Sequence, residues 1–139
     1  MKKDEIIAGL NEFPYGKEGI WLITGAALVL YGVRDETADI DLGCTSAVAD
    51  RLEEDGYLCK VTEDGNRRFK IDDHIEVFEN WLFDRVELHD GCPVMSLKGI
   101  REMKQHLGRE KDLRDIRLID DFLSKTDPDK SAGKSSIWS

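Results

Sequence analysis

A small-residue turn and a pair of closely spaced carboxylates, both within residues 22–42, constrain this chain most. The segment reads LITGAALVLYGVRDETADIDL. The apolar residues 20–23 predict a buried strand that stops at Thr24, and Gly25 permits a tight turn into a helix. Residues 26–31 are long enough for about two helical turns, and Gly32 is placed to end them. We therefore expect a strand, a turn and a short helix in direct succession.

The start of that short helix is a candidate site for an anion. Backbone N–H groups there have no partner within the helix, and the helix dipole adds positive charge, so the two effects together favour a phosphate. We assign this contact to Thr24, Gly25 and Ala26. The alternative is an ordinary packing helix whose small residues allow close contact, and the sequence alone leaves both readings open.

Two carboxylates follow, Asp39 and Asp41, and they alternate with the apolar Ile40 and Leu42. Alternate side chains of a strand share a face, so both carboxylates would project one way, about 6–7 Å apart along the strand. Close carboxylates repel each other unless a cation lies between them, and Mg²⁺ prefers oxygen ligands. The pair therefore predicts a site for a divalent cation, although an edge strand with one solvated face shows the same alternation.

The order of these pieces resembles that of the nucleotidyltransferase fold superfamily related to DNA polymerase beta. The signature of that family is a Gly-Gly or Gly-Ser turn, a short helix and then, about ten to fifteen residues on, an Asp-x-Asp or Asp-x-Glu strand. Arg34, Thr37, Asp39 and Asp41 also match the Arg-x-x-Thr-x-Asp-x-Asp form of small bacterial members, including minimal nucleotidyltransferases and abortive-infection toxins. The resemblance covers about residues 20–120 and implies an α/β fold, in which a nucleotidyltransferase-like mixed β-sheet is flanked by helices.

The resemblance also implies a third carboxylate on a later strand. Residues 74–78, HIEVF, have the expected flanking apolar side chains, so Glu76 would complete a catalytic and metal-binding triad with Asp39 and Asp41. This chain departs from the family in two places, because Glu76 stands where Asp is commoner and Ala26 stands where many active members have Ser. The alternative for Glu76 is a solvated side chain on a half-buried strand.

The C-terminal part carries basic residues in a pattern that small family members show near their last helices. Lys104 or Lys111 could meet a triphosphate as a point charge, and Arg109 could bind it through two hydrogen bonds. Residues 98–117 hold seven basic and four acidic side chains, in a chain of net charge −9. This local reversal supports a polyphosphate site, although a solvated basic helix face would show the same composition.

With the resemblance, these residues predict an enzyme that depends on Mg²⁺ or Mn²⁺ and moves a nucleoside monophosphate from an NTP, expected to be ATP, onto an acceptor hydroxyl. Arg34 would join the phosphate contacts. The acceptor would be a small molecule, a protein or a tRNA, and a protein partner or a second copy of the chain would complete the cleft. A second class of function stays open, in which the chain is a noncatalytic member that binds a partner, as in toxin–antitoxin pairs. Ala26 and Glu76 favour this second class.

Length and composition limit the number of domains, the classes of partner and the location of the protein. The 139 residues suffice for one domain, which we place at residues 1–125, followed by a flexible polar tail at residues 126–139. The excess of 29 acidic over 20 basic residues opposes general binding to duplex nucleic acid or to anionic membranes. No apolar run reaches the roughly 20 residues that span a bilayer, and residues 1–13 lack the apolar core of a signal peptide, so we expect a cytoplasmic protein with no membrane partner.

Periodicity and turn signals predict the other elements. Helices are expected at residues 3–12, 46–55, 97–107 and 112–124. Strands are expected at residues 38–42, 57–62, 67–71, 75–78 and 85–89, with a hairpin turn at residues 63–66.

Overall fold

A computed structural model describes residues 1–126 of the chain. They divide into two compact units, Met1–Ile100 and a second unit that begins at Arg101. Of the predicted tail, Thr126 is the last residue of a helix, and residues 127–139 lie outside the described part.

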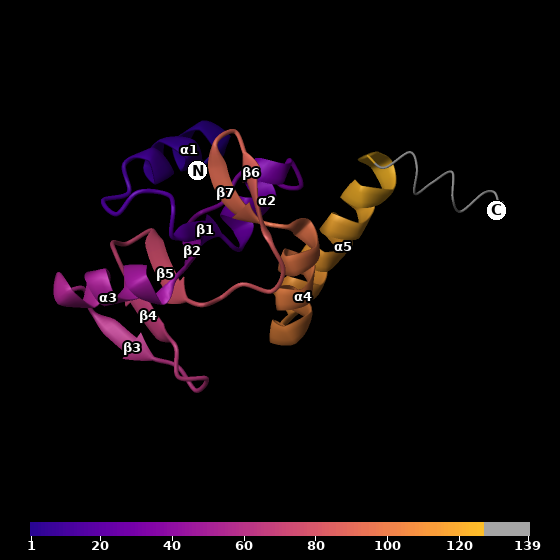
Figure 1. Cartoon of the computed structure of the whole chain (residues 1–139). Coiled ribbons are helices and arrows are strands. Elements are labelled where there is room, and N and C mark those ends of the chain that lie inside the picture. The colour runs from indigo at the N-terminus through magenta and orange to yellow at the C-terminus, as the bar shows by residue number, and fades with distance from the viewer. Residues whose placement is uncertain (127–139) are drawn as a thin grey trace. The chain divides into compact units, whose positions relative to one another are not determined.

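Seven strands of the first unit form one mixed sheet, which confirms the α/β class (Figure 1). They are β1 (Ile20–Leu22), β2 (Ile40–Cys44), β3 (Cys59–Val61), β4 (Arg67–Lys70), β5 (Ile75–Glu79), β6 (Val86–His89) and β7 (Cys92–Met95). Their order across the sheet is β3-β4-β5-β2-β1-β7-β6. Strand β2 lies at the centre, antiparallel to β1 and parallel to β5, so the sheet brings three separate segments of the predicted site side by side.

Five helices accompany the sheet within the described residues. They are α1 (Lys3–Asn11), α2 (Gly25–Tyr31), α3 (Ser46–Glu54), α4 (Leu97–Leu107) and α5 (Glu110–Thr126). As predicted, Gly32 ends α2, and it does so in the left-handed conformation, with φ of 85°. The Thr45 side chain caps α3 by accepting a hydrogen bond from the Val48 amide at 3.3 Å. No helix of the described part is both long enough and apolar enough to cross a membrane.

One face of the sheet supplies the hydrophobic core of the first unit. Leu22, Leu42, Phe69 and Val77 project from four strands to this face and are almost completely buried. The alternate residues of β2, β5, β4 and β3 project to the opposite face, and many of them are charged. The period-2 alternation of these strands therefore separates a core face from a charged face.

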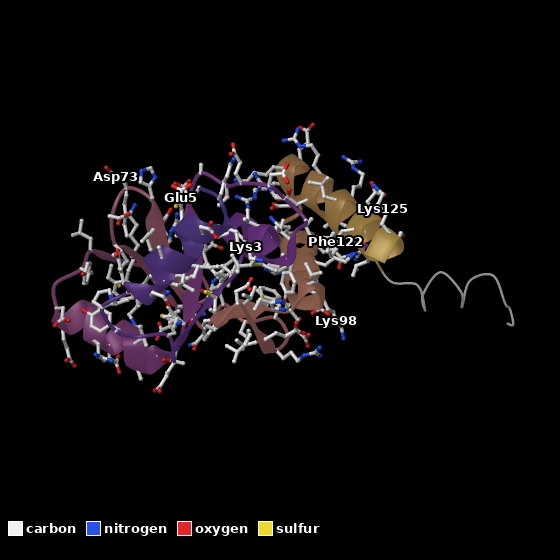
Figure 2. The ribbon with its side chains drawn as sticks, turned by 90° about the horizontal axis from the view of Figure 1, so that it is seen from above. Lys3, Glu5, Asp73, Lys98, Phe122 and Lys125 are labelled. Atoms are coloured by element: carbon white, nitrogen blue, oxygen red, sulfur yellow. The ribbon has the colours of Figure 1, made fainter. Side chains whose placement is uncertain are left out.

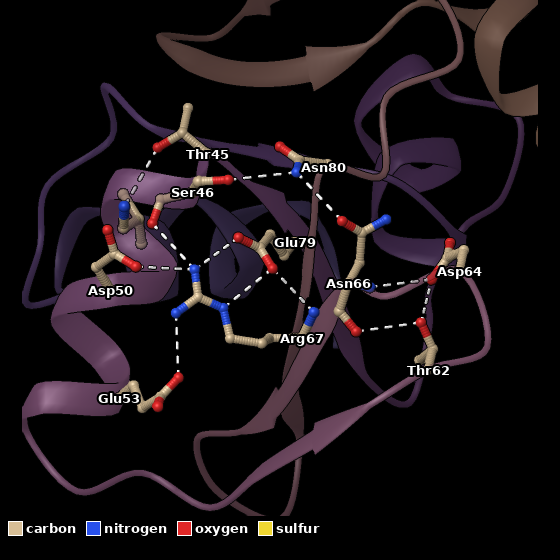
Figure 3. A network of polar contacts seen from close by, with 11 residues as sticks. Thr45, Ser46, Asp50, Glu53, Thr62, Asp64, Asn66, Arg67, Glu79 and Asn80 are labelled. Atoms are coloured by element: carbon tan, nitrogen blue, oxygen red, sulfur yellow. Dashed lines mark hydrogen bonds and ion pairs between the residues drawn. The ribbon is translucent and has the colours of Figure 1, made fainter.

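An ion-pair network joins α3 to the core face of β4 and β5 (Figure 3). The Arg67 guanidinium lies 2.7 Å from one carboxylate oxygen of Glu79 and 3.0 Å from the other. It also pairs with Asp50 at 2.9 Å and with Glu53 at 3.1 Å, both on α3. Hydrogen bonds from Arg67 lower the pKa of the buried Glu79 carboxyl to about 2. The network thus holds the β3–β4 hairpin against α3.

Strands β2 and β7 differ most from the sequence prediction. Strand β2 begins at Ile40 rather than at Ala38 and continues to Cys44, so Asp39 precedes the strand. The sequence does not predict β7, because Pro93 cannot donate a backbone hydrogen bond. All four side chains of β7 are nevertheless buried, and Pro93 pairs with Leu88 of β6. Burial in the folded chain therefore stabilises β7 as a strand despite Pro93.

Candidate functional site

The parallel pairing of β2 with β5 brings two of the predicted carboxylates together. Asp41 and Glu76 are register partners, so their side chains project from neighbouring strands, about 4.8 Å apart, on the same face of the sheet. This is the charged face, opposite the core. The pairing meets the expectation that Glu76 lies beside the Asp-x-Asp segment.

Asp39 lies just before β2, and its side chain is exposed. Its Oδ1 atom lies 3.4 Å from Nδ1 of His74, a residue to which the sequence analysis assigns no role. Burial is the main cause that raises the pKa of the Asp41 carboxyl, and the negative charges of Glu76 and Asp39 raise it further. The three predicted carboxylates are therefore electrostatically coupled.

Thr24 acts on Asp41 rather than on the helix that follows it. Its hydroxyl donates a hydrogen bond to Oδ2 of Asp41 at 2.8 Å, and this bond lowers the pKa of Asp41 against the effect of burial. Thr24 occupies the N-cap position of α2, but its side chain accepts no capping hydrogen bond there. In this structure the Thr24 hydroxyl therefore contacts a carboxylate, and its contact with a phosphate stays a prediction.

Gly25 lies where Arg34 and Thr37 approach the backbone. A Cβ atom at Gly25 would stand 2.6 Å from Oγ1 of Thr37 and 3.1 Å from Nη1 of Arg34, which explains the need for glycine. Gly25 and Ala26 are both buried. The Thr37 hydroxyl also donates to the carbonyl oxygen of Asp39 at 3.4 Å. The structure thus gathers Arg34 and Thr37 around the predicted turn and links Thr37 to Asp39.

Arg68 is a partner of Glu76 that was not among the predicted site residues. Its Nη2 and Nε atoms lie 2.6 Å and 2.8 Å from Oε2 of Glu76, and its guanidinium stands 5.0 Å from the centre of the Phe78 ring. Arg68 therefore adds a positive charge beside the carboxylates. The alternation of Arg68 and Lys70 in a predicted strand is the signal that could have placed both on one face.

A hollow of about 410 Å³ lies beside this ion pair, on the charged face of the sheet. It is lined by Leu58, Lys60, Arg68, Lys70 and Glu76. Three of its five lining residues are cations, so it favours an anionic occupant.

The predicted phosphate-binding cations of the second unit differ in accessibility. Lys104 is 4% exposed, and its Nζ lies 2.8 Å from Asp115 and 3.6 Å from Asp112. Arg109 binds Asp112 through Nε at 2.6 Å and Nη2 at 3.2 Å, but half of its side chain is exposed. Lys111 is exposed. Lys104 is therefore held in a buried ion cluster, whereas Arg109 and Lys111 reach solvent.

The donor chemistry of the carboxylates fits Mg²⁺ or Mn²⁺, because all three offer oxygen ligands and two of them raise the pKa of the third. As the side chains stand, no three acidic, His or Cys side chains within residues 1–126 form a group that could hold a metal ion. Glu76 turns to Arg68 and Asp39 lies near His74. Binding of a metal therefore requires that Glu76 and Asp39 rotate toward Asp41.

Comparisons of this chain with models of known protein families, with curated proteins and with solved structures find no match. The residues of the candidate site are therefore the basis for inferring a function.

Proposed function

We propose that this protein is a metal-dependent nucleotidyltransferase that binds an NTP over the charged face of β2 and β5. The observation that supports the proposal most is the register pairing of Asp41 with Glu76, with Asp39 electrostatically coupled to them. Close carboxylates cost stability when no cation is bound, and such a cost is typical of functional sites. Arg34 and Thr37, the first two residues of the Arg-x-x-Thr-x-Asp-x-Asp motif, lie beside the glycine turn and add further support.

The residues of the site have distinct roles in this proposal. Asp39, Asp41 and Glu76 supply the ligand oxygens, and Thr24 orients Asp41 through its hydrogen bond. A divalent cation held there would neutralise phosphate charge and make an acceptor hydroxyl easier to deprotonate. Arg34 would bind phosphate oxygens. Of the predicted phosphate contacts in the second unit, Arg109 and Lys111 reach solvent, whereas Lys104 is buried in an ion cluster.

The reaction balances without another reactant. The acceptor oxygen forms a bond to the α-phosphorus of the NTP, the bond from that phosphorus to the bridging oxygen breaks, and pyrophosphate leaves. The proton of the acceptor hydroxyl passes to a carboxylate, for which we propose Glu76. This arrangement corresponds to in-line displacement, in which positioning and charge stabilisation supply most of the rate.

Calorimetric titration with each NTP, in the presence and absence of Mg²⁺, tests the nucleotide site. We expect Mg²⁺-dependent binding that weakens by at least about 100-fold in the Asp39→Asn/Asp41→Asn variant, because Asn cannot supply the negative charge that the cation needs. A matched control is Glu54→Gln/Glu63→Gln, which removes two exposed carboxylates from α3 and the hairpin turn. Equal NTP affinity in the two variants would refute the assignment.

A second function is favoured by one observation. Arg68 already supplies a positive charge to Glu76, at 2.6 Å, where the catalytic proposal needs a cation. A noncatalytic protein that keeps the fold and binds a partner would use such an internal pair. Absence of binding to every NTP, with Mg²⁺ and with Mn²⁺, would favour this second function.

A further inference from the structure

The exposed side of the β3–β4 hairpin carries more positive charge than the structure neutralises. Lys60 and Arg68 are register partners on neighbouring antiparallel strands, and Lys70 follows Arg68 on the same face. Like charges placed directly opposite each other destabilise a strand pair. This arrangement therefore costs folding free energy unless an anion binds there.

Among residues 1–126, a single carboxylate lines the hollow beside these three cations. Glu76 is the register partner of Lys70, but its carboxylate binds Arg68. Within residues 1–126, neither Lys60 nor Lys70 takes part in any ion pair or hydrogen bond of its side chain. Two lysines therefore face the hollow without a counter-charge, in a chain whose net charge is −9.

Aromatic rings continue the same face of the sheet. Phe78 projects beside Arg68, its ring lies 5.6 Å from that of Trp81, and Trp81 lies 5.8 Å from Phe83. All three rings are partly exposed. A row of cations next to partly exposed rings suits single-stranded nucleic acid, because cations meet the phosphates and rings stack on bases. An acidic peptide would use the cations but has no need of the rings.

We propose that the hollow on the β3–β4 hairpin binds a single strand of nucleic acid through Lys60 and Lys70, and that this strand carries the acceptor hydroxyl. Glu76 belongs both to the hollow and to the carboxylate site, so a strand end that enters the hollow reaches the proposed reaction centre. The acceptor role rests on the proposed function, whereas the binding of the strand does not depend on it.

Fluorescence anisotropy with a labelled dodecamer, as RNA and as DNA of the same sequence, tests the binding without NTP or divalent cation. We expect Lys60→Ala/Lys70→Ala to weaken binding at least tenfold and to lower the slope of log K against log salt by about 1.4, since each phosphate contact on a single strand contributes about 0.7. The control variant Lys17→Ala/Lys98→Ala removes the same charge elsewhere, because Lys17 donates a hydrogen bond to Asn11 of α1 and Lys98, labelled in Figure 2, lies in α4. It should bind as the unaltered protein does.

Three results would overturn the inference: no binding of either dodecamer, equal loss in both lysine variants, or displacement of the dodecamer by polyglutamate of the same charge. The last result would assign the hollow to an acidic protein partner. Asp39→Asn/Asp41→Asn separates this inference from the proposed function, because that variant should keep its affinity for the strand while it loses NTP binding. If the unaltered protein binds NTP but neither dodecamer, this inference is refuted and the proposed function stands.

Discussion

At the scale of single residues, burial and neighbouring negative charge both oppose the ionisation of Asp41 in the candidate site. Its carboxylate is largely buried beside Glu76, and its pKa is raised by that burial and by the two neighbouring carboxylates. The hydrogen bond from Thr24 compensates only in part, since it lowers the pKa that the other effects raise. A charged Asp41 is therefore maintained at a cost in folding free energy, as is usual where a residue is kept for function.

We expect Asp41→Asn to increase the free energy of unfolding by about 1 kcal/mol at pH 7 without metal, because it removes a charge that burial disfavours. The folded pKa of Asp41 is raised, so its charge costs stability above that pKa and costs nothing below the unfolded value of 3.8. The gain should disappear as the pH falls to that range. Urea unfolding at pH 7 and pH 3.5 measures both. The exposed Asp73 serves as a control (Figure 2), and an equal gain from Asp73→Asn would contradict the explanation.

At the scale of elements, one arginine links the hairpin to the rest of the first unit. Arg67 and Arg68 are neighbours in β4, yet they serve opposite faces, since strand side chains alternate. Arg67 binds Glu79, Asp50 and Glu53 on the core side. Arg68 binds Glu76 on the charged side. The hairpin is thus fixed on the core side while its other face stays available for a ligand.

Arg67→Met should destabilise the first unit by about 3 kcal/mol at pH 7, because it leaves the Glu79 carboxylate buried without its partner. Arg67 lowers the pKa of Glu79 from 4.5 to about 2, so the stabilisation is present above pH 4.5 and is lost as the pH falls toward 2. Urea unfolding across that interval measures the loss. The double variant Arg67→Met/Glu79→Leu should recover much of the stability, and a double variant less stable than Arg67→Met would contradict the ion-pair explanation.

At the scale of the whole molecule, charge is distributed unevenly. The chain has a net charge of −9, but cations are concentrated on the β3–β4 hairpin and in residues 98–117. In the second unit part of this positive charge is internal, because Lys104 is buried with Asp112 and Asp115. Local basic composition therefore overstates the charge that a polyphosphate could reach.

Lys104→Met should lower the free energy of unfolding of the second unit by about 3 kcal/mol, because Asp112 is completely buried and would lose one of its two cations. Hydrogen exchange of α4 and α5 amides measures this effect in that unit. NTP affinity at a temperature where the variant is folded should change less than threefold, because the Lys104 side chain is buried. A loss of NTP affinity without a change in amide exchange would instead indicate that Lys104 contacts phosphate.

The sequence by itself determined the elements that local chemistry controls. Glycine conformation ends α2 at Gly32, side-chain capping starts α3 at Thr45, and alternation sets which face Asp41 shares with Glu76 once their strands pair. Candidate residues of the carboxylate cluster could be chosen from such patterns, since spacing of two along a strand fixes a common face.

Only the tertiary structure decided which strands are neighbours. Burial makes β7 a strand despite Pro93, and the parallel pairing of β2 with β5 places Glu76 against Asp41. Folding also pairs Arg68 with Glu76 across neighbouring strands and buries Lys104 among acidic side chains of the next helix. Local propensity carries no information about these outcomes, because the energy of such contacts comes from packing and charge in the folded state.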